Sequence, residues 1–314
     1  MADFIRIESN SVPPGAEIFD FKGSDGGRLR AAVFPAENAR GGVVLMAGRS
    51  EFIEKYFEVV HDLRARRFAV ATMDWRGQGL SERLLPVSVK GHITDFGAYR
   101  ADLRLFTEEV ARKRFPGPLV LLTHSMGGLP ALQLLADGYD AFSAAVLSAP
   151  MTQFFADPLK RITARAMASA ACAVGASRQS ILGVKEYSLK FEGNILTSDQ
   201  TRHARFRELQ AAAPNAILRE PTYGWLKAAM DAIDDIHKPS RFQKLKTAVL
   251  IVSAENDQLV DSNDHKILAA RSSLIDRVTV PGSLHEILME SDPYRNAFWQ
   301  AFDAFVEPRI AATP

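Results

Sequence analysis

The sequence has few of the features that mark several large classes of protein. A single cysteine, Cys172, stands among 314 residues, so an intrachain disulfide is impossible. One cysteine fits either a reducing compartment or a periplasmic protein with few thiols. Neither sign of charge dominates, because 38 Lys and Arg residues face 37 Asp and Glu residues. The chain therefore cannot be a disulfide scaffold, and it lacks the concentrated positive charge of a protein with a nucleic-acid partner.

Long apolar runs are also missing. No stretch reaches the roughly 18 uninterrupted apolar residues that a membrane-spanning helix needs, and the alanine-rich segment 166–176 comes nearest. The first 14 residues contain Asp3, Arg6 and Glu8 and do not resemble a secretory signal. We expect a cytoplasmic protein, with peripheral contact at a membrane surface left open.

Short apolar runs, by contrast, recur along the chain. Glu17–Phe21 and Leu29–Phe34 flank a turn-rich joint and predict an antiparallel hairpin. Six further runs are typical of strands buried on both faces of a parallel sheet: Val43–Met46, Phe68–Met73, Leu119–Leu122, Ala144–Leu147, Ala248–Val252 and Arg277–Val280. Apolar residues at helical spacing lie between them, over residues 52–63, 96–110, 129–135 and 294–305. This alternation predicts an α/β fold with a mostly parallel, eight-stranded sheet.

The alternation stops between Ala149 and Thr247, where the sequence is helical in character throughout. Helices are expected over residues 159–174, 199–213 and 223–236. We predict that residues 1–150 and 241–314 form the α/β core and that residues 151–240 form a helical cap. An insertion at the carboxyl edge of an open sheet lies over the crevice where ligands bind.

A serine flanked by small residues follows the third of the six runs. The segment Thr123-His124-Ser125-Met126-Gly127 fits the nucleophile-elbow pattern G-x-S-x-G, with Thr123 at the first glycine position. The small neighbours leave room for a strained turn that points the serine hydroxyl out of the sheet. The helix that follows directs its first amides and its positive dipole end to the same place. We predict that Ser125 is a catalytic nucleophile.

A serine hydroxyl needs a base, and the base needs an orienting carboxylate. Asp257 lies in the loop after the strand at 248–252, and His285 lies in the loop after the strand at 277–280. The order serine, acid, histidine predicts a triad of Ser125, Asp257 and His285. Glu255 and Asp261 are competing acids in the same loop.

Acyl transfer also needs donors for the developing oxyanion. One candidate is the backbone amide of Met126, directly after the nucleophile. The other is the amide of Arg49, in the loop Ala47-Gly48-Arg49-Ser50 after the first parallel strand. The glycine-dense loop Asp74–Ser81 is interpreted as a tight turn held by the side chains of Asp74 and Arg76, with a loop that borders the site as the alternative. His124 is interpreted as a packing residue that points away from the nucleophile.

With these residues in place, the chain resembles the lysophospholipase and monoacylglycerol lipase branch of the α/β-hydrolases, especially bacterial lysophospholipases. The motifs that carry the resemblance are Gly48-Arg49-Ser50-Glu51 with Glu54-Lys55-Tyr56, Asp74–Gly79 with Ser81, His124–Gly128, and the loops of Asp257 and His285. The likeness spans roughly residues 15–306. Two positions depart from it: Ala47 stands where the family usually has histidine, and Thr123 where it usually has glycine. The resemblance implies hydrolysis of an ester of a single-chain lipid through an acyl-serine intermediate, with no cofactor and no metal.

The predicted cap supplies candidate substrate contacts. Phe154, Trp225 and Met230 are expected to line an apolar acyl site, with Met151, Phe155, Leu226 and Ala229 nearby. The alternative is that these side chains hold the cap helices together. Arg161, Arg165 and Arg178 are weaker candidates for contacts to phosphate or to a membrane surface.

We therefore expect a small lipid or ester as substrate, with a lysophospholipase activity first. A monoacylglycerol lipase, a short-chain carboxylesterase or an aminopeptidase remains open, because fold and triad do not fix the substrate. An acidic group placed to bind an amino terminus would favour the peptidase. A non-catalytic ligand-binding module is the other alternative, supported by Ala47 and Thr123.

Overall fold

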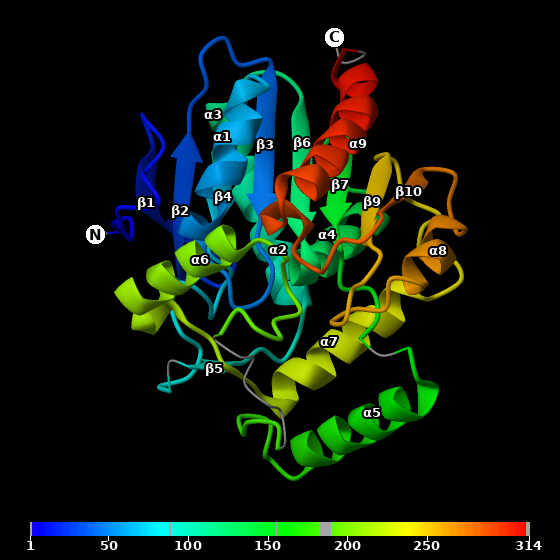
Figure 1. Ribbon diagram of the computed structural model, residues 1–314. Coiled ribbons are helices and arrows are strands. Elements are labelled where there is room, and N and C mark those ends of the chain that lie inside the picture. The colour runs from blue at the N-terminus through cyan, green and yellow to red at the C-terminus, as the bar shows by residue number, and fades with distance from the viewer. Residues whose placement is uncertain (1, 88, 155, 183–189, 312–314) are drawn as a thin grey trace.

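An eight-stranded sheet forms the centre of the computed structural model, which describes residues 2–87, 89–154, 156–182 and 190–311 (Figure 1). The strands are β1 (Glu17–Lys22), β2 (Arg28–Phe34), β3 (Gly41–Met46), β4 (Phe68–Met73), β6 (Leu119–His124), β7 (Ala144–Ser148), β9 (Val249–Ala254) and β10 (Ile275–Val280). Their order is β1-β2-β4-β3-β6-β7-β9-β10. The pairs β1/β2 and β2/β4 are antiparallel and the others are parallel. The predicted hairpin and mostly parallel sheet are confirmed.

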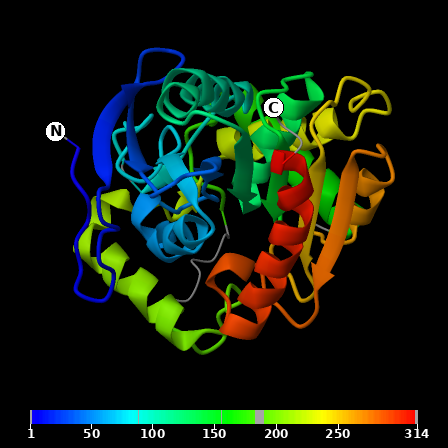
Figure 2. The ribbon, with the colours of Figure 1, turned by 90° about the horizontal axis from the view of Figure 1, so that it is seen from above.

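Helices cover both faces of this sheet, and Figure 2 shows the two layers from above. α1 (Phe57–Ala65) and α9 (Asp292–Ala311) lie on one face, and α2 (Gly97–Phe106) and α4 (Gly128–Ala136) lie on the other. Side chains of β3 alternate between the two layers: Val43 and Leu45 pack with α1 and α9, whereas Val44 and Met46 pack with α2 and α4. The strand is apolar without interruption because both of its faces are buried.

Shorter elements complete the core. They are α3 (Arg112–Arg114), α8 (Asp264–Ala269), a π-helical stretch (Thr107–Ala111) between α2 and α3, and the 3₁₀ turns Ile53–Tyr56, Ser125–Gly127, Pro214–Ala216 and Ile287–Met289.

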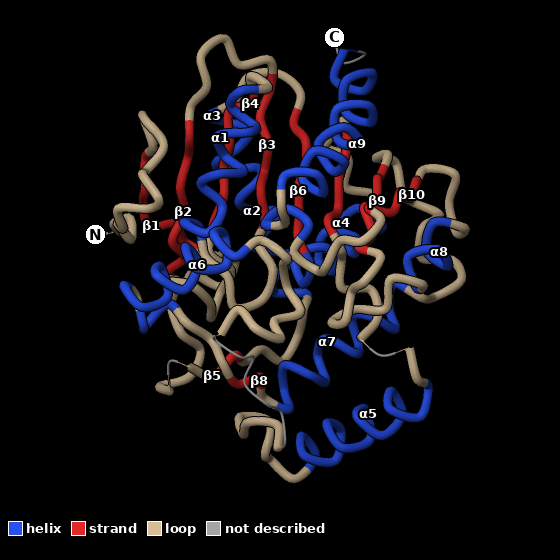
Figure 3. Tube along the Cα trace, viewed as in Figure 1, coloured by secondary structure: helices blue, strands red, loops and turns tan. Residues whose placement is uncertain are grey.

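Three helices between β7 and β9 lie beyond the carboxyl ends of the parallel strands (Figure 3): α5 (Pro158–Ala173), α6 (Gln200–Ala212) and α7 (Tyr223–Ile236). Each begins at a side chain that caps its first amides, namely Asp157, Asp199 and Thr222. α7 packs against α4 of the core and against α5. The three predicted helices are thus present, and they lie where the sheet's crevice opens.

The expectation that this region is helical throughout needs one correction. Residues Glu220–Pro221 form a short strand, β8, which pairs in parallel with β5 (Lys90–Gly91). The physical reason lies in Pro221, because proline disfavours the helical conformation of the residue before it and cannot itself continue a helix. The next helix, α7, therefore begins only at Tyr223.

Candidate active site

Ser125 lies at a sharp turn between β6 and α4. β6 ends at His124, and Ser125 adopts a left-handed backbone conformation with φ of +49°. Such a conformation is strained for a residue with a side chain and is often found at functional sites. Gly127 is required by close packing, since a Cβ there would lie 2.6 Å from the carbonyl oxygen of Ala47. Thr123 is accommodated in the core, fully buried. The elbow predicted from the sequence is therefore formed despite Thr123.

Two loops bring an imidazole and a carboxylate to this serine. His285 Nε2 lies 2.8 Å from Ser125 Oγ, and His285 Nδ1 lies 2.6 Å from Asp257 Oδ2. The other oxygen of Asp257 accepts hydrogen bonds from the amides of Leu259 (2.8 Å) and Val260 (3.0 Å). Three side chains from three strand ends thus meet in the order that a serine hydrolase needs.

The acid of this group is Asp257 and not one of its neighbours. Burial opposes the ionisation of Asp257, but His285 and the two backbone amides outweigh burial, so the pKa of Asp257 lies below its ordinary value. Glu255 instead accepts a hydrogen bond from the amide of Gly282, and Asp261 accepts one from the amide of Asn263.

The loop after β3 lies directly against the nucleophile. A Cβ on Gly48 would come within 3.1 Å of Ser125 Cβ, so the backbone that carries Arg49 is close to the reacting hydroxyl. Trp75 Nε1 donates a hydrogen bond to the carbonyl oxygen of Ala47 (2.8 Å), and the amide of Ser50 donates one to Gln78 Oε1 (2.8 Å). These contacts fix the loop at both ends.

The loop Asp74–Ser81 is the source of both contacts. Asp74 accepts hydrogen bonds from Arg30 Nε, from the amide of Ile53 and from the amide of Leu80. Asp74 thus holds the turn as predicted, whereas Arg76 instead binds Asp25 and Asp102 outside the loop. Trp75 and Gln78 add a function in supporting the loop of Arg49.

A buried ion cluster, which the sequence reasoning did not assign, lies behind the same loop. Lys55 Nζ lies 2.6 Å from Glu51 Oε1 and 2.6 Å from Glu286 Oε1. Glu51 also accepts hydrogen bonds from the amide of Gly48 and from the hydroxyl of Tyr56. The Glu51–Lys55 spacing of four residues was the available signal, but Glu286 comes from the far end of the chain. This cluster joins the loop of Arg49 to the loop of His285.

The charges of this cluster stabilise one another. Burial raises the pKa of Glu51, but the charge of Lys55 and the hydrogen bonds from Lys55 and Tyr56 outweigh burial and lower the pKa to about 2. Burial lowers the pKa of Lys55, but Glu286 and Glu51 outweigh it and raise the pKa. Both groups therefore stay ionised at neutral pH.

His124 does not point away from the site, contrary to the sequence-based interpretation. Its ring centroid lies 4.9 Å from that of His285, and His124 is among the side chains that border the cavity. Burial, together with the charges of His285 and Lys55, outweighs the opposing effect of Glu51 and lowers the pKa of His124 to about 3. His124 is thus a neutral packing partner of His285 at neutral pH.

A cavity of about 430 Å³ opens above the triad. Ser125, His285, Arg49 and Met126 all border it, so the predicted nucleophile, base and oxyanion residues share one space. Its apolar lining includes Met151, Phe154, Ile217, Leu218, Trp225 and Leu259. A mainly apolar chamber of this size with a few polar groups suits a small organic ligand.

The predicted substrate contacts are placed unequally. Phe154 and Trp225 border the cavity, whereas Met230 does not and is buried in the hydrophobic core. Met230 lies five residues after Trp225 in α7, which turns it away from the face of Trp225 by helical geometry. The contact proposed for Met230 is therefore corrected, and Phe155 lies outside the described residues.

The arginines that border the cavity are not the ones expected from the sequence. Arg165 forms ion pairs with Asp231 (2.9 Å) and Asp234 (2.6 Å) of α7, and none of Arg161, Arg165 and Arg178 borders the cavity. Arg207 and Arg219 border it instead, with Phe206 beside them. Within the described ranges, no group of three or more His, Cys, Asp or Glu side chains is arranged to hold a metal ion.

Relatives of known sequence resemble the chain over most of its length. Probable lysophospholipase L2 of Haemophilus influenzae is 28% identical over 279 residues, covering 88% of this chain and 87% of the relative. Lysophospholipase L2 of Escherichia coli strain K12 is 29% identical over 298 residues, covering 91% and 86%. A crystal structure of a soluble variant of monoglyceride lipase from Saccharomyces cerevisiae superposes with a TM-score of 0.74 at 20% identity, covering 96% of this chain and 99% of that chain.

A family profile described as serine aminopeptidase, S33, matches residues 37–292, which include Ser125, Asp257, His285 and all residues that border the cavity. The structural likeness establishes the fold, and the profile establishes the family. The chain belongs to this S33 family of α/β-hydrolases.

Proposed function

We propose that this protein is a serine hydrolase that cleaves carboxylic esters of single-chain lipids, and that its substrates are lysophospholipids. The observation that carries the proposal is the continuous contact from Ser125 Oγ through His285 to Asp257, at the floor of an apolar cavity. The names of the two L2 relatives support the choice of lysophospholipids.

The geometry supports a two-step acyl transfer. Ser125 Oγ attacks the ester carbonyl while His285 Nε2 accepts the hydroxyl proton, and Asp257 holds the imidazole in the required tautomer. The amides of Arg49 and Met126 stabilise the oxyanion. His285 then gives its proton to the alcohol oxygen as the ester bond breaks. The alcohol departs, and the acyl group remains bound to Ser125. Water, deprotonated by His285, attacks the acyl-serine, and the fatty acid departs as Ser125 regains its proton.

An aminopeptidase is the less favoured alternative. A site for an amino terminus needs an uncompensated acidic group, and among the described residues the carboxylates that border the cavity are Glu51 and Glu286. Both already bind Lys55 Nζ at 2.6 Å. The apolar lining favours an acyl chain over a charged amine.

We also propose that residues 151–240 act as a cap that contacts a membrane surface peripherally. Leu159 and Ile162 of α5 are 67% and 65% exposed. The helix carries Lys160 and Arg161 and no acidic residue between Pro158 and Ala173, and its Arg165 is already paired with Asp231 and Asp234 of α7. Exposed apolar and basic side chains on one helix suit the interface of an anionic bilayer. No helix of the described ranges has the length and apolarity needed to cross a bilayer.

Replacing Ser125 by alanine tests the mechanism. Ser125→Ala should lower turnover of a long-chain lysophospholipid by roughly 10⁴- to 10⁶-fold with the fold retained. Wild-type protein should react covalently with a fluorophosphonate, and the variant should not. A panel of lysophospholipids, monoacylglycerols, short nitrophenyl esters and aminoacyl amides then ranks the substrates. Near-normal turnover by Ser125→Ala would remove Ser125 from the mechanism, and selective cleavage of aminoacyl amides would establish the peptidase.

A further inference from the structure

Arg207 borders the cavity, and its hydrogen-bond partners among the described residues are neutral. Its Nη1 donates a hydrogen bond to Gln210 Oε1, and Nε and Nη2 lie 3.4 Å from His203 Nε2. No described carboxylate forms a salt bridge with it. Burial lowers the pKa of Arg207 while the charge of Glu286 raises it, so the guanidinium is partly desolvated and lies within the electrostatic reach of Glu286, the neighbour of His285. A desolvated cation without a paired anion is costly unless a ligand supplies the anion.

His203 neither neutralises the charge of Arg207 nor offers a second cation to an anion in the cavity. Burial and the charge of Arg207 lower the pKa of His203, so its ring is neutral and accepts a hydrogen bond. Glu286 is itself bound to Lys55 Nζ at 2.6 Å. The guanidinium of Arg207 is thus a charged group of the described cavity wall that an anion entering the cavity can bind.

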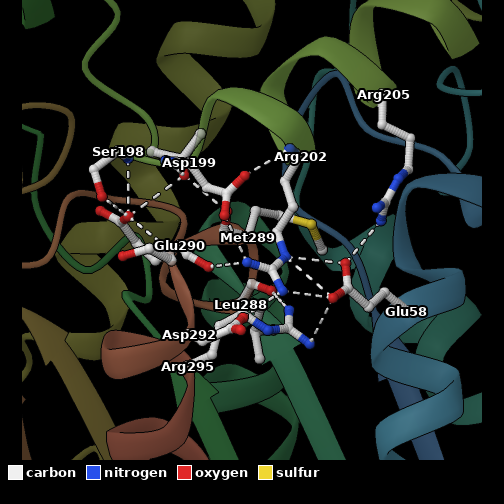
Figure 4. Close-up of polar contacts among 12 residues, drawn as sticks. Glu58, Ser198, Asp199, Arg202, Arg205, Leu288, Met289, Glu290, Asp292 and Arg295 are labelled. Atoms are coloured by element: carbon white, nitrogen blue, oxygen red, sulfur yellow. Dashed lines mark hydrogen bonds and ion pairs between the residues drawn. The ribbon is translucent and has the colours of Figure 1, made fainter.

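The helix that carries Arg207 is fixed in place by two other arginines, Arg202 and Arg205, which Figure 4 shows. Arg202 binds Glu58 of α1 (2.6 Å), Asp199 (2.7 Å) and Asp292 at the start of α9 (2.7 Å). Arg205 binds the same Glu58 at 2.8 Å. α6 is therefore tied to the α/β core, and binding at Arg207 requires little additional ordering of the backbone.

One face of α6 is directed at the cavity. Arg207, Gln210 and Ala211 all border it, and their spacing of three and four residues places them on the same side of the helix. A guanidinium and a side-chain amide one turn apart can both donate hydrogen bonds to the oxygens of a single phosphate.

We propose that Arg207, assisted by Gln210, binds the phosphodiester of a lysophospholipid whose ester carbonyl lies at Ser125. The inference rests on the proposed function and assigns the residues that recognise the phosphate of its substrate. The headgroup of a monoacylglycerol is uncharged and would leave the guanidinium without an anion. Arg207 is thus a residue that sets the preference for a phosphate-bearing headgroup.

The test compares two substrates with the same acyl chain, palmitoyl lysophosphatidylethanolamine and monopalmitoylglycerol, in neutral detergent micelles. Arg207→Gln should lower kcat/KM for the phospholipid about 10- to 100-fold, the range expected for losing a charged hydrogen bond. The value for monopalmitoylglycerol should change less than about twofold. Arg207→Lys should retain part of the phospholipid activity. Arg205→Gln, which removes the same charge from the same helix outside the cavity, should change both substrates alike.

Three results would overturn the inference. A folded Arg207→Gln protein could lose kcat/KM equally on both substrates, or lose it on neither. Arg207→Lys could also lose kcat/KM equally on both substrates. Inhibition of monopalmitoylglycerol cleavage by inorganic phosphate that depends on Arg207, without a headgroup preference, would assign the site to free phosphate and contradict it as well. If wild-type protein cleaves neither long-chain ester, the proposed function fails. If it cleaves both and Arg207→Gln changes nothing, only this inference fails.

Discussion

Lys55 offers the sharpest test of how the site is held together. The side chain is 2% exposed and its ammonium lies between Glu51 and Glu286. Lys55→Met keeps most of the side-chain volume but leaves two buried carboxylates without their cation. Removing one partner of a buried ion pair costs about 3–5 kcal/mol. Urea unfolding at pH 7 should show a loss of that size in the free energy of unfolding, with an unchanged m-value.

The pH dependence of stability shows whether Lys55→Met loses stability through unpaired buried charge or through changed packing. In the wild-type protein the pKa of Glu51 is held at about 2 against the opposing effect of burial. Without Lys55, burial dominates and raises that pKa, so folding favours the protonated carboxyl. The deficit of Lys55→Met should therefore shrink as the pH falls from 7 toward about 4.5. Adding Glu286→Gln should recover at least about 1 kcal/mol. A pH-independent deficit below about 1 kcal/mol, with no recovery in the double variant, would refute the reasoning.

Two further substitutions probe other parts of the structure. The buried hydroxyl of Thr123 has no hydrogen-bond partner in the described part of the chain, so Thr123→Val should raise the free energy of unfolding by about 1 kcal/mol; a lower midpoint in urea would contradict this. Burial opposes ionisation of Glu58, but Arg202, Arg295 and Arg205 outweigh it and lower its pKa from 4.5 to about 2. This carboxylate therefore stabilises the fold above pH 4.5 and loses that effect as the pH falls toward 2. The Tm of Glu58→Gln should lie below that of the wild type at pH 7, and the difference should close between pH 4.5 and 2; a constant difference would show that charge is not the cause.

Local pattern was sufficient to predict the sheet and to select three side chains that meet in the folded chain, for a physical reason. Strands buried on both faces must be apolar without interruption, and a serine at a strained elbow needs small neighbours, so both leave a mark in the sequence. The acid was ambiguous between Asp257, Glu255 and Asp261 because all three share one loop. Only the direction of each side chain, which depends on the contact with His285, separates them.

The cavity wall was harder to predict because distant segments build it. α6 is polar on most of its surface, so its sequence does not reveal which side faces inward, and Arg207 could not be told from its neighbours. Lys55 and Glu286 are separated by 231 positions and meet only in the folded chain. Met230 was misassigned because the apolar face of α7 serves the core and the cavity together, and periodicity alone does not divide them.

The attachment of α6 by Arg202 has a consequence for how a long acyl chain gains entry. α6 is bound to α1 and α9 through Glu58 and Asp292, so its position is fixed relative to the α/β core. α5 packs instead on α7, and is the outermost of the three helices in Figure 3. The wall that carries Arg207 therefore keeps its place relative to the core while a long acyl chain enters.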